Sequence, residues 1–199
     1  MKDHTLITIS RQYGSGGREV AELLAKRMQV RCYDRQILYL AAEKMDAGEM
    51  DISAILDMSY KMPERTFMDG VTSLGYETIP PYNKMYREQA KAIRNIAEKE
   101  SAVFLGRCAD VVLKDFPECY NFFIYADEEY RKNRAKELYG NKTFKELEKE
   151  NRTRERYYNY YTGQKWGDPQ NYHLMINTSQ IGPEKAVDLI INYVENCRK

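Results

Sequence analysis

The sequence predicts a three-layer α/β domain in which helices cover both faces of a parallel sheet. Short runs rich in β-branched and aromatic residues recur along the chain, and longer segments with an apolar residue every three or four positions lie between them. This alternation is typical of parallel strands joined by helical crossovers. Most of the runs are almost continuously apolar, as expected for strands covered on both faces. The 199 residues, 43% of them hydrophobic, are enough for one sizeable core, so we expect a single domain spanning residues 1–199.

The expected elements follow in order along the chain. Strands are predicted at residues 6–10, 30–33, 102–105, 121–125 and 174–178. Helical spacing follows the first strand, through Val20, Leu23, Leu24 and Met28, and the last one, through Ala186, Leu189, Ile190, Tyr193 and Val194. Residues 47–96 are helical pieces broken by a proline and a turn, and we expect a helical insertion over one end of the sheet. Residues 128–170 are very polar, and their helices are expected to project beyond the core.

Composition excludes several classes of function. Lys and Arg number 31 against 30 Asp and Glu, and the resulting net charge of +1 makes a nucleic-acid partner unlikely. No apolar run approaches the length that crosses a bilayer, and the first residues lack the pattern of a signal peptide. We therefore expect a cytoplasmic protein without a membrane partner. The four cysteines have no CxxC spacing and the two histidines lie far apart, so no structural zinc site is expected.

The stretch SRQYGSGGREV, residues 10–20, follows the first expected strand and opens the first helix. The backbone N–H groups of Gly14, Ser15, Gly16 and Gly17 would face the carboxyl edge of the sheet, where an anion can approach closely because glycine has no Cβ. The alternative is a strand–helix turn that needs glycines only for its shape. The position after the first strand favours phosphate binding.

This loop departs from the Walker pattern GxxxxGK[ST], which supplies a lysine for the phosphates and a hydroxyl for magnesium. Aligning Gly16 with the second glycine of the pattern puts Arg11 at the first. Gly17 then stands at the lysine and Arg18 at the hydroxyl, with Glu19 directly after them. Because guanidinium groups bind phosphate through two parallel hydrogen bonds, either Arg11 or Arg18 would supply the missing charge. We therefore count residues 11 and 14–19 as candidate phosphate-binding residues.

Arginines in residues 128–170 form a second cluster. Arg131 and Arg134 are three apart on an expected helix and share a face. Arg152 and Arg156, four apart, do the same, whereas Arg154 points elsewhere on a continuous helix. Any one of them is also explained by a solvated helix face balanced by nearby glutamates. As a cluster they favour phosphate, because phosphoryl transfer requires cations around the equatorial oxygens.

Four tyrosines in the stretch YYNYYTGQKW permit two interpretations: they stack on a base, or they pack this helix against the core. We expect packing for at least two of Tyr157, Tyr158, Tyr160 and Tyr161. Trp166 is expected to anchor the turn that ends the segment. Asp34, at the carboxyl end of the second strand, stands where α/β proteins bind ligands, and the alternative is that it caps the helix beginning near Arg35.

Several blocks of the chain together resemble the cytidylate kinase-like family, a branch of the nucleoside monophosphate kinases. They are ITISRQYGSGGREVAELLAKRM, CYDRQILYLAAEK, VFLGRCAD, YYNYYTGQKWGDPQNYHLMINTS and the closing helix. The resemblance implies a P-loop kinase core, with residues 47–96 as a helical acceptor-binding insertion and residues 128–170 as an arginine-bearing lid. It also implies ATP and Mg²⁺ as cofactors and nucleotides as substrates.

The resemblance further implies an acceptor site at Asp34, Arg35, Tyr39, Arg107 and Asp110. Members of the family have Asp-Thr/Ser-Gly followed by Tyr-Arg after the second strand, and here Arg35 replaces the hydroxyl and Leu40 the arginine. They have Asp-Gly-Arg-Asp after the third strand, where this chain has Leu105-Gly106-Arg107-Cys108. Arg107 is kept, and Asp110 is close enough in sequence to replace a missing acid.

Two functions are compatible with these features. The first is ATP-dependent phosphoryl transfer to a nucleoside monophosphate such as CMP, or to a related small molecule, with Arg18, Arg107, Arg131, Arg134 and Arg154 as catalytic residues. The alternative is a nucleotide-binding regulatory protein of the same fold without kinase activity, because the Walker lysine and hydroxyl are absent. The sequence assigns no metal ligands.

Overall fold

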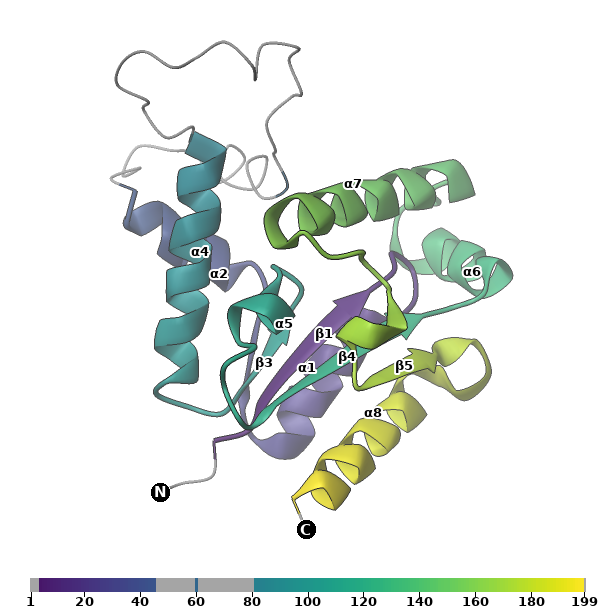
Figure 1. Cartoon of the computed structure of the whole chain (residues 1–199). Helices are drawn as coiled ribbons and strands as arrows, with labels where there is room; N and C mark the ends of the chain where they lie inside the picture. Colours follow the sequence, from purple (N-terminus) through teal and green to yellow (C-terminus); the bar gives the residue numbers. More distant parts are fainter. Residues whose placement is uncertain (1–3, 46–59, 61–80, 199) are drawn as a thin grey trace.

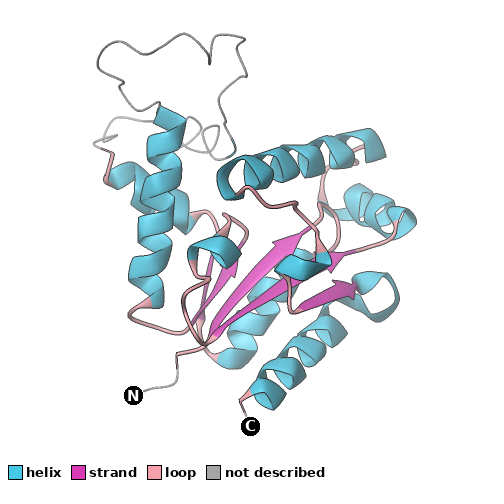
Figure 2. Cartoon of the chain, viewed as in Figure 1, coloured by secondary structure: helices cyan, strands magenta, loops and turns pink. Residues whose placement is uncertain are grey.

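A computed structural model of the chain describes residues 4–45, 60 and 81–198. Five strands form one parallel sheet in the order β2-β3-β1-β4-β5 (Figures 1 and 2). The strands are β1 (Leu6–Arg11), β2 (Arg31–Tyr33), β3 (Ala102–Leu105), β4 (Cys119–Tyr125) and β5 (Leu174–Asn177). All five predicted strands are present, and the predicted parallel three-layer fold is confirmed.

Helices cover both faces of the sheet (Figure 1). On one face, α1 (Gly17–Met28) and α8 (Thr178–Cys197) bury residues such as Leu24 and Ile190 against Ile7 and Ile9 of β1. On the other, α2 (Gln36–Glu43), α4 (Pro81–Ala97) and the short α5 (Ala109–Val112) pack around Phe104 of β3. The central strands β1 and β3 are entirely buried between these layers, which explains their largely apolar sequences.

Two further helices lie across the end of the sheet to which the strand arrows point (Figure 1). They are α6 (Glu128–Leu138) and α7 (Phe144–Thr162), and a short 3₁₀ turn, Pro169–Asn171, follows α7. A capping box fixes the start of α7, with Thr143 and Glu146 each satisfying the backbone N–H of the other. These helices correspond to the segment 128–170 that the sequence predicts as a lid.

The predicted packing role of the α7 tyrosines is confirmed for Tyr157 and Tyr158, which are buried. Trp166 packs edge-on against Phe123 of β4, as expected for an anchor of the turn. Of the predicted insertion 47–96, the structure describes Tyr60 and the part that forms α4; residues 46–59 and 61–80 lie outside the described residues. In the described part of the chain, none of the helices combines the length and apolarity needed to span a membrane.

Candidate functional site

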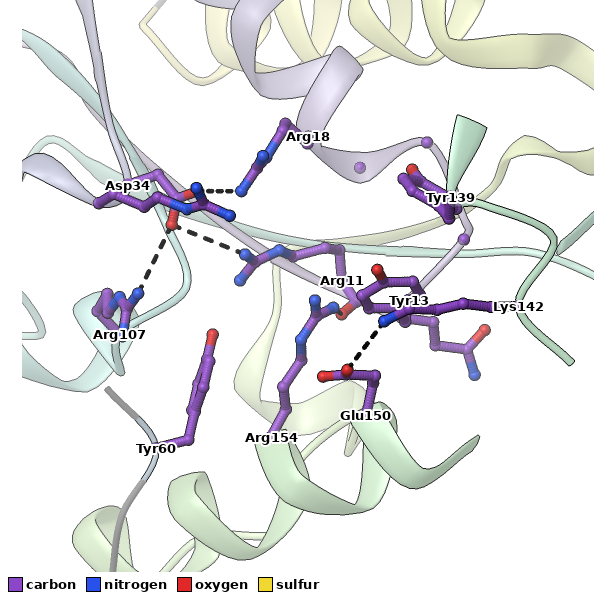
Figure 3. Close-up of a pocket in the computed structure, with 15 residues that line it drawn as sticks. Arg11, Tyr13, Arg18, Asp34, Tyr60, Arg107, Tyr139, Lys142, Glu150 and Arg154 are labelled. Atoms are coloured by element: carbon purple, nitrogen blue, oxygen red, sulfur yellow. Dashed lines mark hydrogen bonds and ion pairs between the residues drawn. The ribbon is translucent and has the colours of Figure 1, made fainter. Parts of the chain in front are cut away.

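A cleft of about 580 Å³ opens where the carboxyl ends of β1, β2 and β3 face α7 (Figure 3). The β1–α1 loop forms its floor, and the connection between α6 and α7 closes one side. Nine of the residues predicted from the sequence line it: Arg11, Gly14, Gly16, Gly17, Arg18, Asp34, Arg35, Arg107 and Arg154. The topology therefore brings together residues from four separate segments of the chain.

The β1–α1 loop holds its shape through two glycines in the left-handed region. Gly14 has φ +83° and Gly16, the N-cap of α1, has φ +79°, a conformation that side-chain-bearing residues rarely adopt. The carbonyl oxygen of Ser15 accepts a hydrogen bond of 2.6 Å from the hydroxyl of Thr178 at the start of α8. The loop consequently presents the start of α1 to the cleft, where the positive end of the helix dipole favours an anion.

Three arginines from different segments surround the carboxylate of Asp34 (Figure 3). Nη2 of Arg18 lies 2.6 Å from Asp34 Oδ2, and the Nη2 atoms of Arg11 and Arg107 each lie 3.9 Å from Oδ1. The alternative, that Asp34 caps a helix, is not what the structure shows, because α2 has its N-cap at Arg35. One carboxylate thus faces three guanidinium groups.

Arg154 of α7 adds a fourth guanidinium group. Its Nη1 donates to the carbonyl oxygen of Arg11 at 3.0 Å, and its guanidinium lies over the ring of Tyr13. Its Nε is buried and has no hydrogen-bond partner in the described part of the chain. Burial, followed by the charge of Arg11, lowers the pKa of Arg154 to about 10. The cost of burying this cation favours an anionic ligand beside it.

The lining as a whole is strongly positive. Six cationic side chains and two carboxylates face the cleft, an excess of four positive charges: Arg11, Arg18, Arg35, Arg107, Lys142 and Arg154 against Asp34 and Glu150. The hydroxyl of Tyr60 responds to this potential. Burial raises its pKa, but the charges of Arg107, Arg11 and Arg154 outweigh burial and lower it to about 8. A protein with a net charge of only +1 therefore concentrates positive charge in one cleft.

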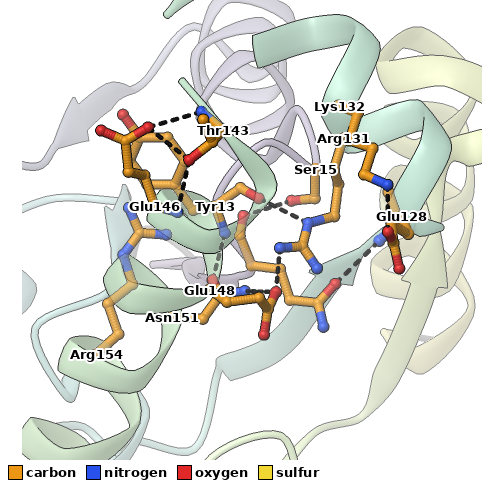
Figure 4. Close-up of polar contacts among 12 residues, drawn as sticks. Tyr13, Ser15, Glu128, Arg131, Lys132, Thr143, Glu146, Glu148, Asn151 and Arg154 are labelled. Atoms are coloured by element: carbon orange, nitrogen blue, oxygen red, sulfur yellow. Dashed lines mark hydrogen bonds and ion pairs between the residues drawn. The ribbon is translucent and has the colours of Figure 1, made fainter. Parts of the chain in front are cut away.

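Two predicted catalytic arginines do not line the cleft. Arg131 is buried, pairs with Glu148 of α7 and donates from Nε to the carbonyl oxygen of Tyr13 at 2.9 Å (Figure 4). Arg134 pairs with Glu19, a predicted phosphate-binding residue, at 2.7 Å. Both arginines connect α6 to the rest of the fold, and Glu19 is engaged in one of these connections.

Three other predicted residues also lie outside the cleft lining. Ser15 is fully buried, and its hydroxyl donates to the carbonyl oxygen of Gln12. Tyr39 packs partly buried on the apolar cluster between α2 and α4. Asp110 is buried and accepts a hydrogen bond of 2.6 Å from the hydroxyl of Tyr158. Burial raises the pKa of Asp110 to about 6, although the bond from Tyr158 opposes the shift.

Sequence reasoning missed part of the lining: Gln12, Tyr13, Tyr60, Tyr139, Lys142 and Glu150. Nζ of Lys142 lies 3.2 Å from Glu150 and 4.9 Å from the centre of the Tyr13 ring, which packs against the ring of Tyr139. Tyr60 lies under the guanidinium of Arg107 at 4.9 Å. Position in the glycine loop was a usable signal for Gln12 and Tyr13, whereas nothing in the sequence marks the other four.

The donor set of the cleft does not fit a direct Mg²⁺ site. Arg18 occupies the position where a Walker loop carries its metal-binding hydroxyl. The two carboxylates of the lining, Asp34 and Glu150, are paired with arginines and a lysine. The described residues contain no cluster of three or more histidine, cysteine, aspartate or glutamate side chains able to hold a metal ion.

Comparisons with known proteins agree with this fold. The sheet order and the flanking helices are those of P-loop kinases, with shikimate kinases and gluconokinases as structural neighbours. The profile of the cytidylate kinase-like family matches residues 6–180, and the chain belongs to this family. No curated protein matches the sequence.

Among solved structures, an uncharacterized protein from Eubacterium ventriosum ATCC 27560 is 27% identical, with a TM-score of 0.72 over 96% of this chain and 99% of that one. A gluconokinase from Sinorhizobium meliloti 1021 is 14% identical, with a TM-score of 0.57 over 98% of this chain and 95% of that one. Shikimate kinase from Bacteroides thetaiotaomicron is 10% identical, with a TM-score of 0.55 over 96% of this chain and 98% of that one. The last two likenesses concern the fold alone.

Proposed function

We propose that the protein transfers the γ-phosphoryl group of ATP to a small anionic acceptor, a nucleoside monophosphate such as CMP or a related molecule. The family and its fold are those of P-loop kinases. The observation that carries the proposal is the excess of four positive charges around the start of α1, with Arg11 and Arg107 buried. A triphosphate is the kind of ligand that such a cleft neutralises.

We assign the side chains of the cleft to the phosphate donor or to the acceptor according to their position. Arg11, Arg18 and the N–H groups at the start of α1 are proposed to hold the donor phosphates, and Arg154 approaches the same loop from α7. Arg107 and Arg35, beyond Asp34, are proposed to hold the acceptor. Held in line, an acceptor oxygen forms the new bond to the γ-phosphorus while the bond to the bridging oxygen breaks and ADP leaves.

The arginines on the donor side and on the acceptor side would together compensate the negative charge that develops during transfer. Because the described residues of the cleft offer no ready Mg²⁺ ligands, the guanidinium groups are the protein's main contribution to this compensation. Tyr60 and the α7 residues Glu150 and Arg154 line the same cleft, and their place beside the phosphates would reduce the access of water, a competing acceptor.

The test is ATP consumption measured with CMP, dCMP, UMP, AMP, shikimate and gluconate as acceptors. Arg154→Gln is compared with Arg156→Gln, because Arg156 lies two residues along α7, is exposed and is outside the cleft. We expect kcat/KM to fall about 100-fold with Arg154→Gln and less than about twofold with Arg156→Gln. Equal effects of the two substitutions would contradict the assignment of the cleft.

The second candidate function, a regulatory protein that binds nucleotide without transferring phosphate, is favoured by the missing Walker lysine and hydroxyl. The two functions differ in one measurement. ATP binding by calorimetry without turnover on any acceptor supports the regulatory function. Absence of ATP binding refutes both.

A further inference from the structure

Arg11 and Gly17, which stand at the first glycine and at the lysine of the Walker pattern, are in direct contact. A Cβ added at Gly17 would lie 2.5 Å from Cβ of Arg11 and 2.9 Å from its Cγ. Carbon atoms do not approach so closely, and Cβ of Arg11 is fixed to β1, the central strand of the sheet. The stem of Arg11 therefore requires glycine at position 17, and a lysine there would exclude it.

The other end of the Arg11 side chain passes a second glycine. Gly106 follows β3 with φ +74°, and a Cβ added there would collide with Nη1 of Arg11. Between Gly17 and Gly106 the side chain is 8% exposed and ends in the cleft, 3.9 Å from Asp34 (Figure 3). Because both glycines lack a Cβ, the Arg11 side chain has room to extend between them from the sheet into the cleft.

Arg18, the other candidate for the missing charge, is placed differently. Its side chain is 50% exposed, and its Nη2 already forms a 2.6 Å ion pair with Asp34. An exposed cation in so close a pair contributes less to holding a ligand than a buried one, because water screens it and the carboxylate neutralises it. Burial and position therefore favour Arg11 over Arg18.

We infer that Arg11 supplies the positive charge for phosphate binding that the lysine of a Walker loop supplies from the position of Gly17. The two differences from the Walker pattern, arginine in place of glycine at position 11 and glycine in place of lysine at position 17, then depend on each other. The inference rests on the proposed function, because it concerns how the same cleft holds a triphosphate. The two positions depend on each other both through the positive charge of Arg11 and through the space that its side chain needs. The guanidinium reaches the phosphates from the central strand instead of the first turn of α1, and it does so only where residue 17 lacks a side chain.

The steric half is tested without any ligand, by thermal unfolding. Gly17→Lys is expected to lower the unfolding midpoint by about 5 °C or more, because its Cβ collides with Arg11. Adding Arg11→Gly removes the collision, so the double variant is expected to unfold at a higher temperature than Gly17→Lys alone. Adding Arg11→Ala is the matched control. It leaves the Cβ–Cβ contact in place, and its double variant is expected to stay as unstable as Gly17→Lys.

The electrostatic half is tested by calorimetry with ATP and with inorganic tripolyphosphate. Arg11→Gln keeps the volume of the stem and removes the charge, and we expect it to weaken both ligands at least tenfold, more than Arg18→Gln does. Arg11→Gly with Gly17→Lys, which recreates the pattern up to its lysine (GxxxxGK) and leaves Arg18 at the hydroxyl position, is expected to bind both at least tenfold more tightly than Arg11→Gly alone.

The outcomes separate this inference from the proposed function. Triphosphate binding by the wild type that survives Arg11→Gln unchanged overturns the role of Arg11 and leaves the proposed function standing. Additive losses of stability in the Arg11→Gly, Gly17→Lys double variant overturn the coupling between positions 11 and 17. A wild type that binds neither ATP nor tripolyphosphate refutes the proposed function, while the unfolding measurements still decide whether the two positions are coupled.

Discussion

Nε of Arg131 donates a hydrogen bond to the carbonyl oxygen of Tyr13 at 2.9 Å, which joins α6 to the glycine loop. The N–H of the same Tyr13 donates to Oδ1 of Asn151 on α7 at 2.7 Å, and Arg131 also pairs with Glu148 on α7 (Figure 4). The backbone of one loop residue, Tyr13, is therefore held by both helices of the predicted lid. Movement of α6 and α7 away from the sheet requires these bonds to break.

The first prediction concerns this connection. Arg131→Met is expected to lower the free energy of unfolding by about 2–3 kcal/mol, because it leaves Glu148 and the Tyr13 carbonyl without their buried partner. Lys132→Met is the control. Lys132 is the next residue of α6 and forms an exposed pair with Glu128, so its loss is expected to cost less than about 0.5 kcal/mol. Similar values for the two variants in urea unfolding would show that Arg131 does not brace the loop.

The second prediction concerns the buried Asp110. Its pKa is raised from 3.8 to about 6 in the folded protein, so between these values the folded state binds more protons than the unfolded state. Its contribution to stability is therefore fully present below about pH 4 and is lost as the pH rises toward 6. The stability of the wild type relative to Asp110→Asn is expected to fall by about 2–3 kcal/mol across this range. A difference that stays constant from pH 4 to 6.5 would contradict the raised pKa.

Tyr158→Phe offers an independent check on the same carboxyl group. The hydrogen bond from Tyr158 opposes the upward shift of the Asp110 pKa. Its removal is therefore expected to raise that pKa further, and the pH range over which stability is lost should move upward with it.

A third prediction uses Tyr60 as a sensor of the charge in the cleft. Its pKa of about 8 results from the positive potential of Arg107, Arg11 and Arg154, which outweighs burial. Tripolyphosphate bound beside these arginines would cancel part of that potential and raise the pKa of Tyr60. Ultraviolet difference titration of the wild type against Tyr60→Phe should show one tyrosine ionising near pH 8 that ionises at higher pH with the ligand. A Tyr60 pKa that ligand leaves unchanged would place the anion elsewhere.

The fourth prediction concerns Mg²⁺. Because Arg18 replaces the metal-binding hydroxyl and both lining carboxylates are paired with cations, ATP binding is expected to depend weakly on the metal. Replacing Mg²⁺ with EDTA should change the Kd for ATP less than about threefold, a change of under about 1 kcal/mol. Calorimetry in the two buffers measures this directly, and loss of ATP binding in EDTA would point to metal ligands that the cleft does not display.

The central strands were predictable because they are buried on both faces and are therefore largely apolar in sequence, as in Ile7 and Ile9 of β1 and Phe122 and Phe123 of β4. The glycine loop was predictable because Gly14 and Gly16 adopt backbone conformations that few other residues tolerate. Burial of a strand and the backbone conformation of a turn both restrict which residue types can stand at neighbouring positions. Both can therefore be recognised from a short stretch of sequence.

The orientation of α7 was harder to predict. Spacing correctly grouped Arg152 with Arg156, but it does not reveal which face of a polar helix meets the sheet. The structure exposes both and turns Arg154 to the cleft. Arg154 shares its face with the buried Leu147, Asn151 and Tyr158, at helical intervals of four, three and four residues. That stripe of large residues was a usable signal.

Contacts between distant segments left no signal at all. Whether Lys142 lies beside Glu150 and Tyr13 depends on the path of the chain between α6 and α7. Asp110 illustrates the opposite difficulty, because proximity in sequence to Arg107 did not place its carboxylate in the same cleft. Such placements follow from the packed fold as a whole.

The passage of Arg11 between Gly17 and Gly106 makes its charge stationary. A lysine in the first turn of a helix sits on a long flexible tether and can follow a phosphate group that shifts during a reaction. The Arg11 guanidinium starts from the last residue of the central strand, and burial of its stem between the two glycines restricts such travel, so here the ligand must come to the charge. The length of the polyphosphate, and the depth to which it can reach, would then decide which molecules this protein accepts.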